Sequence, residues 1–179
     1  MTGTGGFPGV VLVGFMGSGK SSVGRELARR IGAEFVDADA WIERKAGRKI
    51  RVLFAEEGEP AFREMEKAAL REILAVKGRV VAAGGGAFLD EGNRRRMKAY
   101  GAVVYLEASA DTILGRLARD ASRPLLQCGD RESVVRGLLD RRIPEYRRAD
   151  HTVPTDGLTV KEIAGRIIEL LKTREERGI

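Results

Sequence analysis

Residues 14–21 read Gly-Phe-Met-Gly-Ser-Gly-Lys-Ser and match G-x-x-x-x-G-K-[ST], the pattern of a phosphate-binding P-loop. The apolar run at 10–13 predicts a buried strand before the loop, and apolar residues at helical spacing up to Gly32 predict a helix after it. In this setting backbone N–H groups and a helix N-terminus can surround phosphate oxygens. The alternative is an ordinary glycine-rich turn with a solvated lysine, and the strand and helix disfavour it.

Within the motif, Lys20 is expected to reach the β- and γ-phosphates of a nucleoside triphosphate, and the Ser21 hydroxyl to bind Mg²⁺. The predicted nucleotide-binding residues of this segment are Gly17, Ser18, Gly19, Lys20, Ser21 and Ser22. The loop does not identify what receives the phosphate, so the remaining chain has to.

The rest of the chain alternates strand and helix patterns. Strands are predicted at 10–13, 34–37, 79–83, 102–106 and 152–153. Helices are predicted from the P-loop to 31, then at 40–46, from 50, 60–78, 90–100, 111–119, 132–146 and 160–171. Such alternation over 179 residues predicts one α/β domain with a parallel sheet and helices on both faces.

Composition narrows the class of protein. A net charge of +6 favours anionic ligands, and nucleic acid is one candidate. The 6% of aromatic residues do not interleave with the basic clusters at 94–96, 141–142 and 147–148, so we expect no nucleic-acid partner. Each cluster is either a solvated helix face or an anion site. The single cysteine, Cys128, is expected to be a free thiol in a reducing compartment. The chain has no apolar run of membrane-spanning length, and residues 1–8 are expected to form a short flexible lead. We therefore expect a cytoplasmic protein.

Two carboxylates follow the second predicted strand. Alternate residues of an extended chain point the same way, so Asp37 and Asp39 are both expected to face the cleft at the carboxyl ends of the strands. One would position metal-bound water and the other an acceptor hydroxyl. In the alternative, Asp39 caps the next helix and Asp37 is solvated. The third strand ends in glycine where many P-loop enzymes carry a metal-binding aspartate, so Asp37 is predicted to join Ser21 as a metal ligand.

Three further features can carry chemistry. Arg63 lies between Glu59 and Glu66 at helical spacing, which indicates either surface ion pairs or a guanidinium held rigid for an anionic substrate. The glycines at 84–86 predict a close approach of ligand to backbone or a flexible turn. Arg123, before a proline in a polar loop, is predicted to bring a cation over the transferring phosphate.

Together these segments resemble the shikimate kinase family. The matching pieces occur in the family's order and cover roughly residues 9–170: the P-loop, Asp37-x-Asp39, Phe62-Arg63-x-x-Glu66, Gly84–Gly86, Arg123-Pro124-Leu125-Leu126 and Arg142-x-Pro144-x-Tyr146. The resemblance implies a three-layer P-loop kinase of the nucleoside-monophosphate-kinase type, with strand order 2-3-1-4-5. It also implies a substrate-binding region at about 38–66, a lid at about 118–130 and a charged tail at 172–179.

The resemblance further implies ATP-dependent phosphorylation of the 3-hydroxyl of shikimate, on the route to chorismate and the aromatic amino acids, by a monomer using one Mg²⁺. Lys20, Asp39 and Arg123 would be catalytic, and Arg116 would flank adenine. The implied substrate-binding residues are Asp39, Phe54, Phe62, Arg63, Glu66, Gly84, Gly85, Gly86 and Arg142. The turn at 155–158 lacks a proline that packs on adenine in some members. Another small-molecule kinase, such as a gluconate kinase, and a non-catalytic nucleotide switch are the alternatives.

Overall fold

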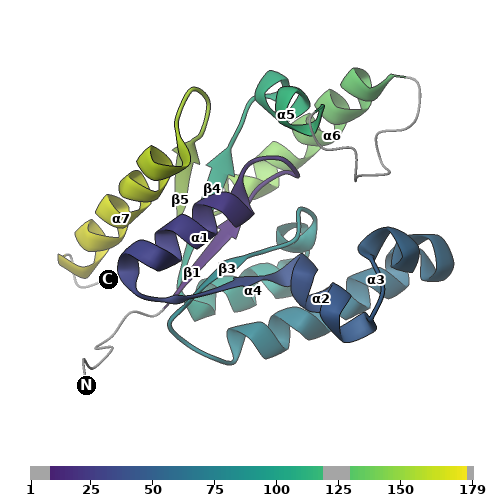
Figure 1. Cartoon of the computed structure of the whole chain (residues 1–179), viewed down its shortest axis with the longest axis horizontal. Helices are drawn as coiled ribbons and strands as arrows, with labels where there is room; N and C mark the ends of the chain where they lie inside the picture. The colour runs from purple at the N-terminus through teal and green to yellow at the C-terminus, as the bar shows by residue number, and fades with distance from the viewer. Residues whose placement is uncertain (1–8, 119–129, 177–179) are drawn as a thin grey trace.

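The computed structural model describes residues 9–118 and 130–176. It contains a five-stranded parallel sheet in the order β2-β3-β1-β4-β5, which confirms the predicted sheet and strand order (Figure 1). The strands are β1 Val10–Val13, β2 Glu34–Asp37, β3 Arg79–Ala82, β4 Ala102–Glu107 and β5 His151–Pro154.

Helices cover both faces of the sheet. They are α1 Lys20–Ile31, α2 Ala38–Ala46, α3 Ile50–Leu74, the 3-10 helix η1 Ala87–Leu89, α4 Glu91–Tyr100, α5 Ala110–Leu117, α6 Arg131–Tyr146 and α7 Val160–Glu176. In β1, Val11 and Val13 face the core with α3, α4 and α6, whereas Val10 and Leu12 face the core with α1 and α7. Alternate residues of a strand therefore pack into two apolar cores, one on each face of the sheet. On one of these faces, α1 and α7 lie side by side (Figure 1).

The strand register brings the candidate residues to one edge. Ala82 of β3 is paired with Leu12 on one side and with Asp37 on the other. The P-loop after β1, the carboxylate at the end of β2 and the glycine turn after β3 therefore emerge together, as expected at the carboxyl ends of parallel strands.

The start of α2 differs from the sequence prediction. α2 begins at Ala38, because the Asp37 side chain caps it by accepting a 3.2 Å hydrogen bond from the Ala40 N–H. The strand-alternation argument for Asp39 was therefore wrong, since Asp39 lies in the first turn of α2. The predicted interruption before residue 60 is confirmed, because Gly58 has non-helical backbone angles (φ 80°, ψ 170°) that kink α3, and Pro60 follows the kink.

The basic cluster at 94–96 is not uniformly solvated. Arg94 is 9% exposed and donates to Glu145 Oε2 at 2.6 Å and to the Phe88 carbonyl at 3.2 Å. This arginine joins α4 to α6 and η1, so for Arg94 both predicted alternatives, the solvated face and the anion site, are wrong. Its neighbours at 95–96 and the pair at 147–148 are exposed.

No helix in the two described ranges is both long and apolar enough to cross a membrane. The predictions for the lead at 1–8, for Arg123, for Cys128 and for most of the lid at 118–130 fall outside the described residues. α7 continues to Glu176, so the predicted charged tail begins inside that helix.

Candidate active site

The P-loop can curve tightly between β1 and α1 because its glycines adopt positive φ. Gly14, Gly17 and Gly19 have φ of 143°, 77° and 99°, in the region that side chains disfavour. A Cβ on Gly14 would lie 2.8 Å from the Leu106 carbonyl oxygen, so space also requires glycine there. Gly19 is the N-cap of α1 and supplies no side-chain hydrogen bond, which leaves the first N–H groups of the helix directed at the loop centre.

Lys20 lies over this loop. Its ammonium donates to the carbonyl oxygens of Gly14 at 2.8 Å and of Phe15 at 2.9 Å. The Ser18 hydroxyl is buried and has no hydrogen-bond partner among the described residues. Ser18 therefore contributes backbone to the loop and Lys20 contributes charge, whereas Ser22 is exposed at the rim.

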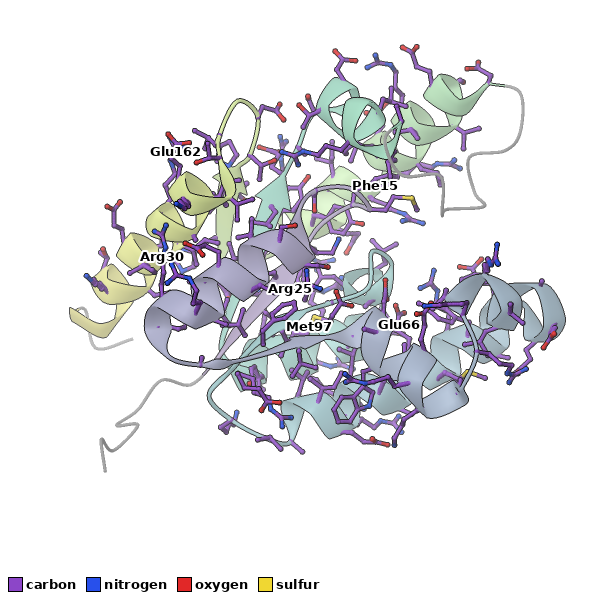
Figure 2. All side chains as sticks on the ribbon, in the orientation of Figure 1. Phe15, Arg25, Arg30, Glu66, Met97 and Glu162 are labelled. Carbon is purple, nitrogen blue, oxygen red and sulfur yellow. The ribbon has the colours of Figure 1, made fainter. Side chains whose placement is uncertain are left out.

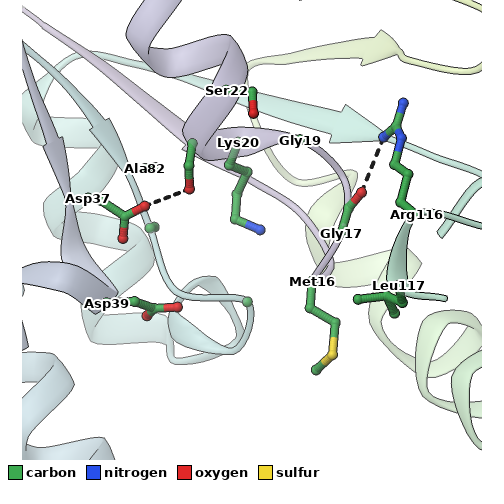
Figure 3. A pocket seen from close by; sticks show the side chains of 13 residues that line it. Met16, Gly17, Gly19, Lys20, Ser22, Asp37, Asp39, Ala82, Arg116 and Leu117 are labelled. Atoms are coloured by element: carbon green, nitrogen blue, oxygen red, sulfur yellow. Dashed lines mark hydrogen bonds between the residues drawn. The ribbon is translucent and has the colours of Figure 1, made fainter. Parts of the chain in front are cut away.

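A cavity of about 290 Å³, here called the P-loop cavity, lies beside this loop (Figure 3). Asp37 and Asp39 lie on one side, Met16 and Leu117 on the other, and Lys20 between them. Its lining consists of Met16, Gly17, Gly19, Lys20, Ser21, Ser22, Asp37, Asp39, Ala82, Ala83, Gly85, Arg116 and Leu117. All the predicted nucleotide contacts of the motif except Ser18 line it.

The pair predicted to bind a metal is already assembled. Ser21 donates a hydrogen bond of 2.5 Å from its hydroxyl to Asp37 Oδ2. Two hard oxygens side by side suit Mg²⁺, which takes one or two protein oxygens together with phosphates and waters. The described residues include no group of three His, Cys, Asp or Glu side chains that could hold a metal without such help. The site therefore fits a metal that arrives with nucleotide.

A second cavity of about 610 Å³, here called the larger cavity, adjoins the first. It is lined by Met16, Asp37, Asp39, Ala40, Glu43, Lys49, Ile50, Arg51, Phe54, Phe62, Arg63, Glu66, Gly85, Gly86 and Arg142. Four residues line both cavities: Met16, Asp37, Asp39 and Gly85. A group held in one cavity can thus meet a group held in the other beside Asp39.

Arg63 is held by two carboxylates of its own helix. It donates from Nη1 to Glu66 at 2.9 Å and from Nη2 to Glu59 at 2.8 Å, but Glu66 is 2% exposed and Glu59 is 62% exposed. Burial raises the pKa of Glu66 while Arg63 lowers it, and the net direction is upward. Burial lowers the pKa of Arg63, but Glu66 and Glu59 outweigh it, so the guanidinium stays charged. Glu66 points inward from α3 (Figure 2).

The glycine turn after β3 is tightly enclosed by these side chains. A Cβ on Gly84 would lie 2.5 Å from Glu66 Oε1 and 2.9 Å from Asp39 Oδ1, and one on Gly86 would lie 2.6 Å from both terminal nitrogens of Arg63. Glycine was expected here for approach of a ligand. At Gly84 and Gly86 the approaching groups are instead the site's own charged side chains, whereas Gly85 lines both cavities.

Arg142 reaches the larger cavity from α6, and Arg63 reaches it from α3. Its guanidinium carbon lies 5.4 Å from the centre of the Phe15 ring, in the P-loop. Phe54 and Phe62 stack at 4.4 Å between ring centres and form an apolar wall, and Phe62 is itself buried. Two cations and two aromatic rings from distant segments therefore line one cavity.

Arg116 contacts the P-loop backbone. It donates from Nη1 to the carbonyls of Gly17 at 3.2 Å and Ser18 at 3.1 Å, and from Nη2 to the Thr155 carbonyl at 3.5 Å (Figure 3). This links α5, the loop and the turn after β5. The adenine contact implied for Arg116 stays a prediction, as does the role of Arg123.

Sequence reasoning missed several lining residues. Met16 occupies a variable position of the P-loop pattern, yet it lines both cavities. Lys49, Ile50 and Arg51, at the start of α3, carry no motif signal. Tyr146 was noted only as part of a motif, although its spacing of four from Arg142 places both on one helix face.

Comparison with known proteins gives a consistent result. The family model described as shikimate kinase matches residues 16–172. The shikimate kinase of Xanthomonas campestris is 46% identical over 162 residues, 90% of each chain, and that of Salinibacter ruber is 46% identical over 93% of this chain and 86% of its own.

Solved structures agree. The shikimate kinase of Acinetobacter baumannii in complex with shikimate superposes with a TM-score of 0.90 at 42% identity, over 94% of both chains. A gluconokinase of Sinorhizobium meliloti superposes with a TM-score of 0.62 at 23% identity, which shows a shared fold alone.

Proposed function

The chain belongs to the shikimate kinase family, and from that premise we propose that it transfers the γ-phosphoryl group of ATP to the 3-hydroxyl of shikimate. One observation supports the assignment most: the larger cavity holds two convergent arginines and shares Asp39 with the P-loop cavity. A cyclic acid bound by its carboxylate would present a hydroxyl at that junction.

Arg63 and Arg142 are the proposed carboxylate clamp. A planar guanidinium offers paired N–H donors that match two carboxylate oxygens. Glu66 holds Arg63 from the buried side, at 2.9 Å, so the group is oriented before substrate arrives. Phe54 and Phe62 offer an apolar wall for the ring carbons.

Phosphoryl transfer needs positioning and neutralisation of charge more than covalent chemistry, because its transition state is loose. The amides of the P-loop and the Lys20 ammonium would bind the β- and γ-phosphates, and Arg123 would add a cation. Mg²⁺ bound through Ser21 and Asp37 would neutralise phosphate charge. Arg116, held on the Gly17 and Ser18 carbonyls, supports the shape of the loop.

Asp39 is proposed to orient the acceptor hydroxyl. An alcohol is far less acidic than an aspartic acid, so this carboxylate cannot remove the proton in the ground state. It would accept a hydrogen bond from the hydroxyl and take the proton late, as the oxygen–phosphorus bond forms.

The proposal is tested by steady-state kinetics of the parent chain with ATP and Mg²⁺. The acceptors are shikimate, its neutral carboxamide, gluconate and water. We expect turnover with shikimate, a large loss with the amide and near-background rates with gluconate and water. Lys20→Ala is the negative control, expected to fold normally and to lose nearly all transfer.

The clamp is tested in the same assay with Arg63→Ala and Arg142→Ala. Removing one partner of a buried charged pair costs about 2–5 kcal/mol, or roughly 30- to several-thousand-fold in kcat/KM. Each variant should lose most of the preference for the acid over the amide. Faster turnover with gluconate, or ATP hydrolysis insensitive to every acid, would contradict the proposed substrate.

A further inference from the structure

Tyr146, the last residue of α6, is fully buried and contacts the turn that separates the two cavities. Its hydroxyl donates a hydrogen bond to the backbone carbonyl of Gly85, 61 residues away in sequence. Gly85 lines both cavities, so this hydrogen bond fixes the backbone at the junction where acceptor and phosphate would meet.

One of the two clamp arginines lies close to Tyr146 on the same helix. Arg142 lies one helical turn earlier on the same face of α6. Burial raises the pKa of Tyr146, while the charge of Arg142 and a hydrogen bond from it act in the opposite direction. Arg142 is bounded on another side by the Phe15 ring, at 5.4 Å. The guanidinium therefore has the phenolic oxygen as a polar neighbour and a ring as an apolar one.

We propose that Tyr146 is a positioning residue for the acid: through one hydroxyl it orients the Arg142 guanidinium and fixes the Gly85 carbonyl. Because the hydroxyl donates to the Gly85 carbonyl, the lone pairs of its oxygen stay available to an N–H group of the arginine, so the two roles do not compete. The arginine's remaining N–H groups then face the larger cavity. This inference rests on the proposed function, because it names how that site recognises its carboxylate.

A neighbouring tyrosine separates the role of the hydroxyl from that of the ring. Tyr105 of β4 stacks on Tyr146 with 5.1 Å between ring centres, and it is equally buried. The Tyr105 hydroxyl, however, has no hydrogen-bond partner among the described residues. Tyr105→Phe removes this oxygen and keeps the packing of the ring. It is therefore a matched control for Tyr146→Phe.

The experiment compares parent, Tyr146→Phe and Tyr105→Phe. Shikimate binding is measured by calorimetry without nucleotide, and KM and kcat are measured with shikimate and with its carboxamide. For Tyr146→Phe we expect Kd and KM for shikimate to rise roughly 10-fold, since the hydrogen bond it loses is to a charged group. KM for ATP should stay within about two-fold, and the preference for acid over amide should shrink by a similar factor. Tyr105→Phe should match the parent.

The acid-to-amide ratio is taken within one preparation, so partial unfolding lowers both rates equally and leaves the ratio unchanged. If Tyr146→Phe is recovered unfolded, Tyr146→Met replaces it, because methionine fills irregular buried space without a hydroxyl. The same loss of preference is expected. An unchanged ratio in the folded variant, or an equal loss in Tyr105→Phe, would overturn the inference. Turnover of shikimate by the parent would leave the proposed function standing in either case.

Discussion

Nη1 of Arg63 donates to Oε2 of Glu66 at 2.9 Å, and only 2% of the Glu66 side chain is exposed. The same guanidinium donates to Glu59, whose side chain is 62% exposed. One cation thus has a buried partner toward the cavity and a solvated partner away from it. Substituting Glu66 and Glu59 in turn therefore compares a buried partner of Arg63 with an exposed one.

We expect Glu66→Gln to raise KM for shikimate by about ten-fold or more, because an amide holds the guanidinium less firmly and a buried charge loses its partner. Glu59→Gln is the matched control. It should change KM by less than about two-fold, since exposed ion pairs contribute little. Both variants are compared by steady-state kinetics, and equal effects would show that Glu66 does no more for Arg63 than the exposed Glu59 does.

The pH dependence of stability should reveal the burial of Glu66. Folding raises the pKa of this carboxyl, so the folded chain binds its proton more tightly than the unfolded chain does. Its stabilising contribution is then full below 4.5, the usual glutamate value, and is lost as pH rises through the folded pKa.

Glu66→Gln stays neutral and lacks this dependence. The melting temperature of the variant minus that of the parent should therefore become more positive as pH rises above about 4.5. Other groups titrate alike in both chains and cancel in the difference. A difference that falls with pH would mean that Arg63 outweighs burial and that the pKa of Glu66 is lowered by folding.

Gly86→Ala should displace Arg63, because the new Cβ would lie 2.6 Å from both terminal nitrogens of the guanidinium. We expect kcat/KM for shikimate to fall by roughly ten- to a hundred-fold, the usual cost of a misplaced binding group. Gly137→Ala in α6 is the control. A Cβ there meets nothing within 4 Å, and alanine suits a helix better, so activity should be kept and stability should rise slightly.

Substitutions of Asp37 and of Asp39 should have different effects when activity is measured against Mg²⁺ concentration. Asp37→Asn is expected to raise the Mg²⁺ concentration for half-maximal activity by about ten-fold or more, because it weakens the oxygen pair with Ser21. Asp39→Asn should lower kcat by roughly 100-fold or more at an unchanged Mg²⁺ midpoint, since an amide cannot take the hydroxyl proton. A shifted midpoint in both variants would make Asp39 a metal ligand as well.

Local patterns in the sequence determined the P-loop and the succession of strands and helices in this protein. The residues at 10–13 and the glycines of the P-loop predicted the strand and turn, because their constraints are local: apolar period, positive φ and helix start. The five predicted strands and their order were confirmed. The order had been predicted from the family resemblance. The residues brought together at the cavities, Asp39, Arg63 and Arg142 among them, were also named from motifs.

The tertiary structure decided what depends on contacts between distant segments. Asp37 capping α2 placed Asp39 in a helix, although the strand pattern had predicted an extended residue. Arg94 looked like a surface cation until Glu145, 51 residues away, proved to be its partner. Tyr146 and Gly85 are separated by 61 residues, so no local period could pair them. Such pairs form only where the fold brings distant segments together, which the order of residues alone does not reveal.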